Sequence, residues 1–388
     1  MNNSDLFQQI VKNATAKSTN RFPAIDISSE CSVGCLFCFN QNEIPGTIHR
    51  VSPMTEYELD YILSIMKEHN PNIEMIQIGS GDKIWWGDPL AHPKFNEYLQ
   101  KIIATFPLAE IHMDTSAYYL SDEILETLIE HNNKIRIHLS VNSMDMNTRS
   151  KFYQKPDNKG LLKVLKNLRI DYAYLKHFGN VETSIFDIES LLEYTNINNI
   201  CYYKLHYTKY NNARAINIIN ETQNTFYESL DAIYRKHSHL VNVLHAEVQW
   251  LDNEYDKMSA LFPENINFLD SVYKAISSNY DLSKTSCCTG ESSYSYIKDL
   301  FEKNTVVKAK NNSYGGSITS SGLLMLQDIL DAFDNHAPAK GFSYAIPSEI
   351  IDENGFDRVG MCLNEFKRIC KSKYEIEIID LQSIMFSY

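Results

Sequence analysis

The chain alternates six times between segments with the period of a β-strand and segments with the period of an α-helix. Such repeats predict a parallel sheet with helices packed outside it, because parallel neighbours need a crossover connection. The expected strands are residues 22–27, 73–78, 110–114, 134–141, 170–176 and 199–206, and the expected helices are residues 55–68, 93–105, 121–131, 160–168 and 185–194. A short amphipathic helix is expected ahead of them, over residues 5–17.

Three cysteines, Cys31, Cys35 and Cys38, follow the first expected strand closely. Thiolates at this spacing can bind three corners of one iron–sulfur cluster. Three ligands leave one iron without a protein ligand, as a catalytic metal site keeps an open position. A structural zinc site needs a fourth Cys or His, and residues 26–48 offer none. The pattern therefore favours a cluster with an open coordination position.

The loop Cys31–Cys38 resembles the signature of the radical S-adenosylmethionine (SAM) superfamily, C-x3-C-x-aromatic-C, with Phe37 as the aromatic residue. The resemblance implies an α/β fold, a partial (β/α)6 TIM-like barrel over residues 21–255 that follows an N-terminal helix region, residues 1–20. It also implies a [4Fe–4S] cluster on the three cysteines, SAM at the open iron and a flavodoxin- or ferredoxin-type reductant. SAM would then yield a 5′-deoxyadenosyl radical that takes hydrogen from a substrate.

The resemblance further assigns SAM contacts to the turn after the second strand. Two glycine–acid pairs occur there, Gly81-Asp82 and Gly87-Asp88, where family members carry a Gly-Gly-Glu-Pro-like turn. Because an insertion separates the pairs, either aspartate could hold the SAM amine. The ring of Phe37 would lie against the adenine.

Later strand ends supply the remaining SAM contacts that the resemblance implies. Thr115 follows the third strand, and Ser140 and Asn142 lie two apart on the fourth, so both are expected on one face, where they would bond the ribose. Arg149 or Lys151 would meet the SAM carboxylate.

Beyond about residue 255 the alternation fades, and residues 256–388 are expected to form a smaller α+β domain. We expect a turn at Ser286–Gly290, a helix over 294–303 and a strand over 305–309. The stretch is similar to the C-terminal domain of unknown function in a clostridial and cyanobacterial group of radical SAM proteins. Its glycine-rich segment 312–322 is typical of a strand-to-helix connector, with an anion cradle at a helix N-terminus as the alternative.

The other five cysteines are Cys201, Cys287, Cys288, Cys362 and Cys370. By default they are buried thiols that act as small hydrophobic side chains. The alternatives are a second cluster drawn from the last four, and a thiol at Cys201, Cys287 or Cys288 that returns a hydrogen atom to a substrate radical.

Charge and composition limit the partners. A net charge of −13 disfavours non-specific nucleic-acid binding, and we expect no membrane partner because no apolar run reaches the length of a bilayer span. Ordinary cysteine usage without a signal peptide predicts a reducing, cytoplasmic location. On the fifth and sixth strands Lys176, Lys204 and His206 would suit an anionic substrate if their faces point inward.

The expected function is therefore a radical SAM enzyme that abstracts hydrogen from a small metabolite or a short peptide in a biosynthetic pathway. One alternative is a SAM-dependent methyl or aminocarboxypropyl transferase that uses the same cluster. The other is a non-catalytic iron–sulfur or zinc protein.

Overall fold

The structure, a computed structural model, divides the chain into two compact units. The residues it describes are 23–28, 30–38, 41–42, 44–45, 53–79, 87–237, 244–246, 273–301, 305–319, 321–347, 350–351 and 355–380. The first unit comprises Met1–Asn42, Ile48–Leu205 and Asn211–Glu247, and the second Glu43–Thr47, His206–Tyr210 and Val248–Tyr388. The expected helix over residues 5–17, the expected N-terminal region 1–20 and the expected boundary at residue 255 lie outside the described residues, so these remain predictions.

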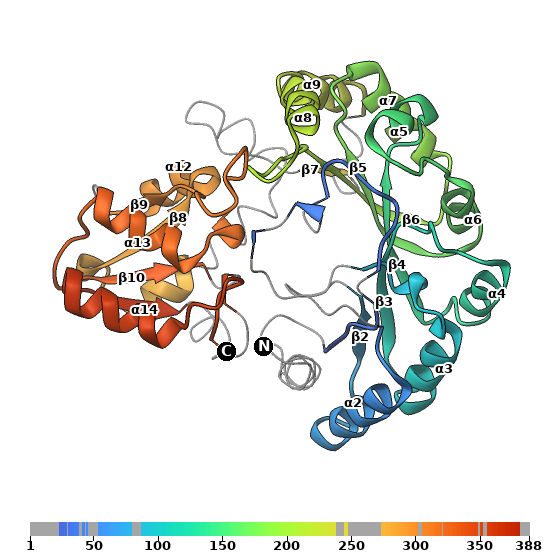
Figure 1. Ribbon diagram of the computed structural model, residues 1–388, viewed down its shortest axis with the longest axis horizontal. Helices are drawn as coiled ribbons and strands as arrows, with labels where there is room; N and C mark the ends of the chain where they lie inside the picture. The colour runs from blue at the N-terminus through green and yellow to red at the C-terminus, as the bar shows by residue number, and fades with distance from the viewer. Residues whose placement is uncertain are drawn as a thin grey trace. The chain divides into compact units, whose positions relative to one another are not determined.

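The first unit is built on one sheet whose strands run in chain order, β1 to β7, with every neighbouring pair parallel. Helices lie on the outer side of the curved sheet (Figure 1). The strands are β1 Ala24–Ile25, β2 Met75–Ile78, β3 Glu110–Thr115, β4 Ile135–Asn142, β5 Ile170–Lys176, β6 Ile197–Tyr203 and β7 Leu244–Ala246. The helices are α2 Glu56–His69, α3 Phe95–Thr105, α4 Asp122–Glu130, α5 Met146–Phe152, α6 Lys159–Asn167, α7 Val181–Leu192, α8 Ala213–Gln223 and α9 Phe226–His237. The expected partial barrel is confirmed, with β7 added at its end.

Local sequence signals fix where these helices begin. Thr55 caps α2: its hydroxyl accepts from Glu58 N (3.3 Å), and the Glu58 carboxylate accepts from Thr55 N (2.7 Å). Ser121 caps α4 by accepting from Ile124 N (3.1 Å). Both starts therefore follow from the sequence.

Strand alternation separates a helix-facing core from a more polar inner face. On β4, Ile137 and Leu139 are fully buried, whereas His138 between them points to the opposite face. Between β4 and β5 the register shifts, because Ile137 pairs with Ile170 but His138 pairs with Tyr172. Asp171 is thus an extra residue in β5, and such a bulge can re-aim a side chain.

The second unit holds a four-stranded sheet in the order β11-β10-β8-β9, again with every pair parallel. Its elements are β8 Thr285–Gly290, α12 Glu291–Leu300, β9 Val307–Ala309, α13 Leu326–Asn335, β10 Ser343–Ile346, α14 Leu363–Ile369 and β11 Glu377–Asp380. This arrangement is α/β, where α+β was expected for the smaller domain. The turn expected at Ser286–Gly290 is wrong: these residues form the central strand β8, every one of them buried.

The glycine pair of the second unit approaches another backbone. Gly315 and Gly316 have φ of +64° and +65°, and a Cβ on Gly316 would lie 2.3 Å from Tyr207 O. The neighbouring backbone N–H groups of Asn312 and Ser313 donate to Asp328 Oδ1 at 3.0 and 2.9 Å. A side-chain carboxylate of the chain itself therefore satisfies these two N–H groups of the glycine-rich segment.

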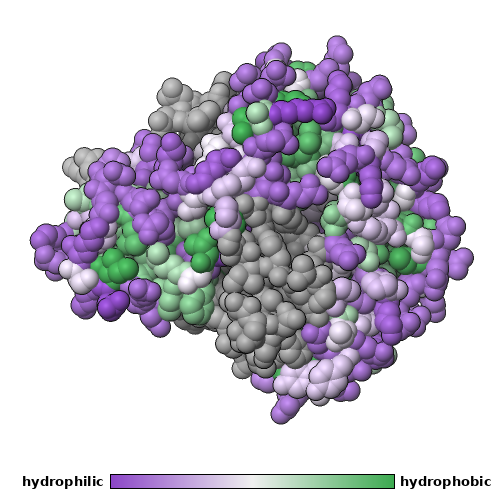
Figure 2. All heavy atoms as spheres, viewed as in Figure 1, coloured by the Kyte–Doolittle hydropathy of each residue, from purple (hydrophilic) through white to green (hydrophobic). Residues whose placement is uncertain are grey.

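Hydrophilic residues cover most of the described surface seen in Figure 2. Leu108 and Tyr57 are the most exposed large hydrophobic residues described, at 82% and 76%. None of the helices in the described ranges is long and apolar enough to cross a membrane.

Candidate active site

The cysteine loop follows β1 and pairs with residues 152–155, which begin at the last residue of α5. Cys35 and Tyr153 form an antiparallel bridge. The backbone hydrogen bonds run from Leu36 N to Phe152 O (2.9 Å), from Gln154 N to Gly34 O (3.2 Å) and from Lys155 N to Val33 O (3.2 Å). A segment more than one hundred residues later in the chain thus fixes the loop at the carboxyl end of the parallel sheet.

The three thiols of the loop lie close enough to influence one another. Removal from water, then the nearby Asp88 carboxylate and Cys38 thiol, raise the pKa of Cys31 to about 11, although Lys155 acts against this. Burial, followed by Cys38 and Cys31, raises the pKa of Cys35 above its usual range. Loading the loop with a metal group would therefore release protons, because thiolates are the binding form.

The spacing of the thiols bears on which metal group they fit. Among the described residues, one set of three ligand atoms from His, Cys, Asp or Glu side chains lies within 4.8 Å of one another. These atoms belong to His112, His138 and Asp171, and not to the cysteine loop. Thiolates that share one zinc ion, at about 2.3 Å each, lie about 4 Å apart. A cluster with one thiolate per iron requires a wider spacing. The three thiols therefore do not lie as close together as the ligands of one bound zinc ion.

Asp88 holds together the turns after β2 and β3. It caps the short 3₁₀ helix Pro89–Ala91 by accepting from Leu90 N (3.1 Å). It also accepts from the Thr115 hydroxyl (2.8 Å) and from the Ser116 backbone N (2.9 Å) and hydroxyl (2.6 Å). Burial raises the pKa of Asp88, and the hydrogen bonds from Ser116 and Thr115 oppose that rise. A carboxylate has about four lone pairs, so these donors use its capacity.

Arg149 and Phe37 both contact the ring of Tyr153. The Arg149 guanidinium is buried and donates to Val141 O (2.8 Å), Ser143 O (3.0 Å) and Pro156 O (3.1 Å). Its Cζ lies 4.8 Å from the centre of the Tyr153 ring. The Phe37 ring meets Tyr153 edge-on at 5.8 Å. Arg149 therefore ties the end of β4 to the segment that holds the cysteine loop.

The other predicted SAM contacts are placed as follows. Gly81 and Asp82 lie outside the described residues, and Gly87 is buried directly before Asp88. Ser140 is half-buried on β4. Asn142 has a φ of +59°, and its side-chain amide donates to Ser140 O (3.3 Å). This left-handed backbone interrupts the strand alternation, so the rule that placed Ser140 and Asn142 on one face does not apply.

The three candidate hydrogen donors differ in setting. Cys201 lies on β6, paired in register with Tyr174 of β5. Cys287 and Cys288 lie in β8 and pack into two different apolar clusters, on opposite faces of the second sheet. Burial raises the pKa of both β8 thiols. Cys287 and Cys288 therefore point away from each other, which disfavours a second cluster that uses both.

Sequence reasoning missed several residues beside the loop. Lys155 Nζ donates to the Ser32 hydroxyl (2.9 Å), and the Tyr119 hydroxyl donates to the same oxygen (2.8 Å). Ser116 is the strongest partner of Asp88. These residues carry no motif, since their role depends on which turns the fold brings together.

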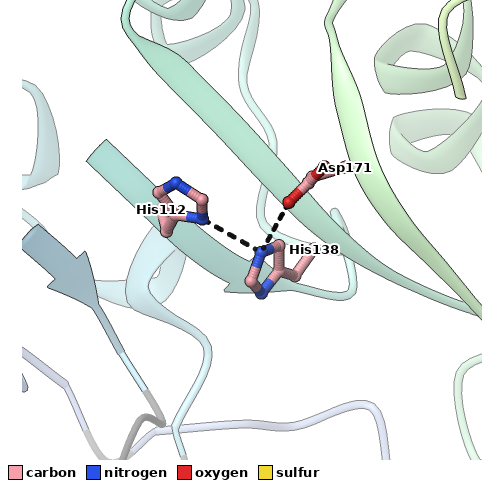
Figure 3. Close-up of side chains that lie close together, drawn as sticks. All are labelled: His112, His138 and Asp171. Atoms are coloured by element: carbon pink, nitrogen blue, oxygen red, sulfur yellow. Dashed lines mark hydrogen bonds and ion pairs between the residues drawn. The ribbon is translucent and has the colours of Figure 1, made fainter. Parts of the chain in front are cut away.

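A second polar cluster, also missed, lies on the inner face of β3, β4 and β5. Figure 3 shows His112 and Asp171 turned toward His138. His112 Nδ1 is 3.2 Å from His138 Nε2, and Asp171 Oδ2 is 3.7 Å from the same Nε2. Burial, followed by His138, lowers the pKa of His112, which favours its neutral form. Only the β5 bulge at Asp171 completes the trio, and no sequence periodicity reveals a bulge.

Residues 25–170 match the family model of the Radical SAM superfamily. No curated protein matches the sequence. Among solved structures, the chain is similar to Streptococcus suis SuiB bound to its precursor peptide SuiA, with 14% identity, a TM-score of 0.41 and coverage of 61% of this chain and 50% of SuiB. It is also similar to anSMEcpe with bound AdoMet, with 12% identity, a TM-score of 0.38 and coverage of 57% and 61%.

A third similar structure is TsrM, a radical SAM methyltransferase from Kitasatospora setae with cobalamin and a [4Fe–4S] cluster bound. It shows 9% identity, a TM-score of 0.36 and coverage of 47% of this chain and 36% of that one. The chain thus spans about half the length of the SuiB structure that it matches. Residues 25–170, which include the cysteine loop, therefore match a radical SAM domain.

Proposed function

We propose that Cys31, Cys35 and Cys38 hold a [4Fe–4S] cluster and that the chain binds SAM beside it to abstract hydrogen from a small molecule or a short peptide. The observation that carries the proposal is the pairing of the cysteine loop with residues 152–155 at the carboxyl end of the sheet. When bound, the cluster and SAM supply a 5′-deoxyadenosyl radical after reduction by a flavodoxin- or ferredoxin-type protein in the cytoplasm.

The chain's own residues position this chemistry. The acceptor sites of Asp88 are already used within the protein, which supports a role for Asp88 in shaping the turns around SAM. Asp82 is then the residue that we propose to hold the SAM amine. Three donors of Arg149 are likewise used on backbone carbonyls, so we assign it to positioning as well. Lys155, beside Ser32 and Cys31, becomes the candidate for the SAM carboxylate. Phe37 stays the candidate for the adenine, and Thr115, Ser140 and Asn142 for the ribose side.

The inner face of the sheet supports an anionic or polar substrate. Tyr172 and Tyr174 stack with ring centres 6.2 Å apart, and Lys176 Nζ lies 4.4 Å from the Tyr203 ring centre. Tyr202 does not belong to this face, because it packs against His177 and Phe226 under the helices. We propose no nucleic-acid or membrane partner.

Cys201 shares the inner side with Tyr174 and Tyr203, since Tyr202 points the other way. We propose it, ahead of Cys287 and Cys288, as a hydrogen donor if the reaction is redox-neutral. Its thiol hydrogen would pass to the substrate radical, and an external reductant would then supply one electron and one proton to restore the thiol. A Cys201→Ala variant that still releases product at the full rate would exclude this role.

Anaerobic reconstitution followed by SAM and dithionite tests the main proposal. We expect about four irons per chain and release of 5′-deoxyadenosine. Both should be lost in Cys31→Ala and kept in Cys362→Ala, a matched thiol outside the loop. Methylthioadenosine as the sole product of a loaded protein would favour aminocarboxypropyl transfer instead. Failure to bind iron would contradict the proposal and favour a non-catalytic protein.

A further inference from the structure

We propose that His112, His138 and Asp171 form a binding site for one divalent transition-metal ion, with Zn²⁺ as the best fit. The site lies on the inner face of β3, β4 and β5, and each strand contributes one ligand (Figure 3). Two imidazoles and a carboxylate suit such ions, and three protein ligands leave an open position for water or a substrate group. The inference does not rest on the proposed SAM chemistry.

The distances between ligand atoms match one shared ion. Two nitrogens, each about 2.0–2.1 Å from a tetrahedral zinc ion, lie about 3.3 Å apart. His112 Nδ1 and His138 Nε2 are 3.2 Å apart. Asp171 Oδ2 lies 3.7 Å from His138 Nε2, and all three ligand atoms fall within 4.8 Å of one another. The carboxylate oxygen lies farther out than the two nitrogens, so it would have to move inward to join the coordination sphere.

The outer nitrogens of both rings face carboxylates, as they do around bound metal ions. His138 Nδ1 lies 3.5 Å from Asp114 Oδ1, and His112 Nε2 lies 3.8 Å from Glu110 Oε2. Among the described residues this buried His112 Nε2 has no hydrogen-bond partner. Carboxylates favour the N–H tautomer at these outer atoms. The inner nitrogens then present lone pairs to each other, an arrangement that a metal ion between them would stabilise.

Amide side chains hold the acidic groups in orientation. Asp171 Oδ1 accepts from Asn198 Nδ2 (3.1 Å), which leaves Oδ2 toward His138. Asp114 Oδ2 accepts from Gln77 Nε2 (2.7 Å), which leaves Oδ1 toward the same ring. Each carboxylate thus has one oxygen fixed and the other turned to the histidines, the usual support of a metal ligand.

The net charge of the groups around the two histidines also favours a divalent cation. Glu110, Asp114 and Asp171 surround the two rings, and the Arg136 guanidinium pairs with Glu110. Three carboxylates and one guanidinium leave two negative charges, which one divalent ion would neutralise. Tyr172 and Tyr174, edge-on to His138 at 5.1 and 6.4 Å, add no charge. A bridging proton would engage only the two nitrogens, whereas a metal ion also engages Asp171.

The test uses the full-length chain with Cys31→Ala, Cys35→Ala and Cys38→Ala, so that the cysteine loop cannot compete for metal. Titration with Zn²⁺ should give one ion per chain. X-ray absorption should show nitrogen and oxygen ligands at about 2.0–2.1 Å and no sulfur at about 2.3 Å. In this background His138→Gln should lower the affinity at least about 100-fold and Asp114→Asn about 10- to 100-fold. His69→Gln, at an exposed histidine on α2, should leave it unchanged.

Three results would overturn the proposal: no zinc uptake by the folded parent chain, sulfur in the coordination sphere, or unchanged affinity in a folded His138→Gln variant. A histidine pair bridged only by a proton would give the first of these. If His138→Gln does not fold, the X-ray absorption spectrum of the parent and the zinc affinity of Asp114→Asn still test the proposal. Because the tested variant lacks the thiols of Cys31, Cys35 and Cys38, its zinc binding is measured independently of any SAM chemistry.

Discussion

The polar groups at the two ends of the first sheet differ in the partners that the protein gives them. At the carboxyl end, Asp88 accepts from four groups and Arg149 donates to three carbonyls, so the buried charges there are engaged within the protein. In the amino-terminal half, His112 and His138 face each other and Asp171 is turned toward them at more than hydrogen-bond distance. The first end is held together by hydrogen bonds within the protein, whereas at the second two imidazoles and a carboxylate oxygen face one another where we propose a metal ion.

The contrast has an energetic meaning. Buried groups with several internal partners stabilise the fold and cost much to alter. Groups that face the proposed metal ion should contribute little to the stability of the metal-free protein and much to that of its metal complex. Without metal, substitutions at the carboxyl end should therefore lower the free energy of unfolding more than substitutions in the histidine trio.

The largest effect is expected for Gly160→Ala, beneath the carboxyl-end turn. A Cβ at this position would lie 1.9 Å from Ala117 O, so α6 or the turn after β3 must move. We expect a loss of at least about 3 kcal/mol in the free energy of unfolding, measured by urea denaturation. Gly341→Ala is the control, because no atom lies within 4 Å and only its φ of +75° is strained; it should cost about 1–2 kcal/mol. Equal losses at both glycines would contradict the close contact at Ala117.

Asp88→Asn should come next, at about 2–3 kcal/mol. The amide keeps the shape but turns an N–H₂ group toward donors on Ser116 or Thr115. Urea unfolding measures the loss, and Asp122→Asn, which removes an exposed pair with Lys163, should cost below about 1 kcal/mol. A stability unchanged by Asp88→Asn would show that the carboxyl end is less dependent on this carboxylate than its contacts indicate.

A third histidine, His177, extends the comparison to the pH dependence of stability. It is fully buried and contacts the Tyr202 hydroxyl at 2.7 Å and the Thr225 hydroxyl at 3.0 Å. Burial lowers its pKa from 6.5 to about 4. Between these values the unfolded chain binds more protons than the folded one, so stability falls as pH falls from 6.5 toward 4.

From pH 7.5 to pH 5 this group should cost about 2 kcal/mol of unfolding free energy. The measurement is urea unfolding at both pH values in the parent and in His177→Gln, where the part of the pH dependence due to His177 should vanish. An identical pH dependence in both proteins would show that folding leaves the pKa of the His177 imidazole unchanged.

The smallest effect is expected for His112→Gln without metal, below about 1 kcal/mol, since its ring makes one 3.2 Å contact with His138. The same change should remove the rise in Tm that Zn²⁺ gives to the parent. Thermal unfolding with and without Zn²⁺ checks both statements. A loss of several kcal/mol in the metal-free protein would show that the histidine pair is a structural element in its own right.

Much of the first unit could be predicted because its signals are local. Capping at Thr55 and Ser121 fixed two helix starts, and the expected strand over residues 170–176 coincides with β5. The second unit was harder. Its central strand, Ser286–Gly290, has small residues and ends in glycine, which is typical of a turn; burial between two helical layers makes it a strand instead.

The site shows the same division. The spacing of Cys31, Cys35 and Cys38 predicts a cluster loop, and the cluster ligands stay a prediction. The partners of Asp88 and Arg149 were not predictable, because they come from turns that only the folded sheet brings together. The histidine trio was out of reach for another reason: it needs three strands in register and a bulge at Asp171.

The pairing of the cysteine loop with residues 152–155 also sets an order of events during synthesis. The thiols leave the ribosome well before Phe152 and Lys155, the residues to which the loop backbone is later hydrogen-bonded. At about 5–20 residues per second, that delay is roughly ten seconds. During this interval the loop backbone lacks these hydrogen bonds, so delivery of the proposed cluster would follow the synthesis of α5 or would need a factor that holds the nascent loop.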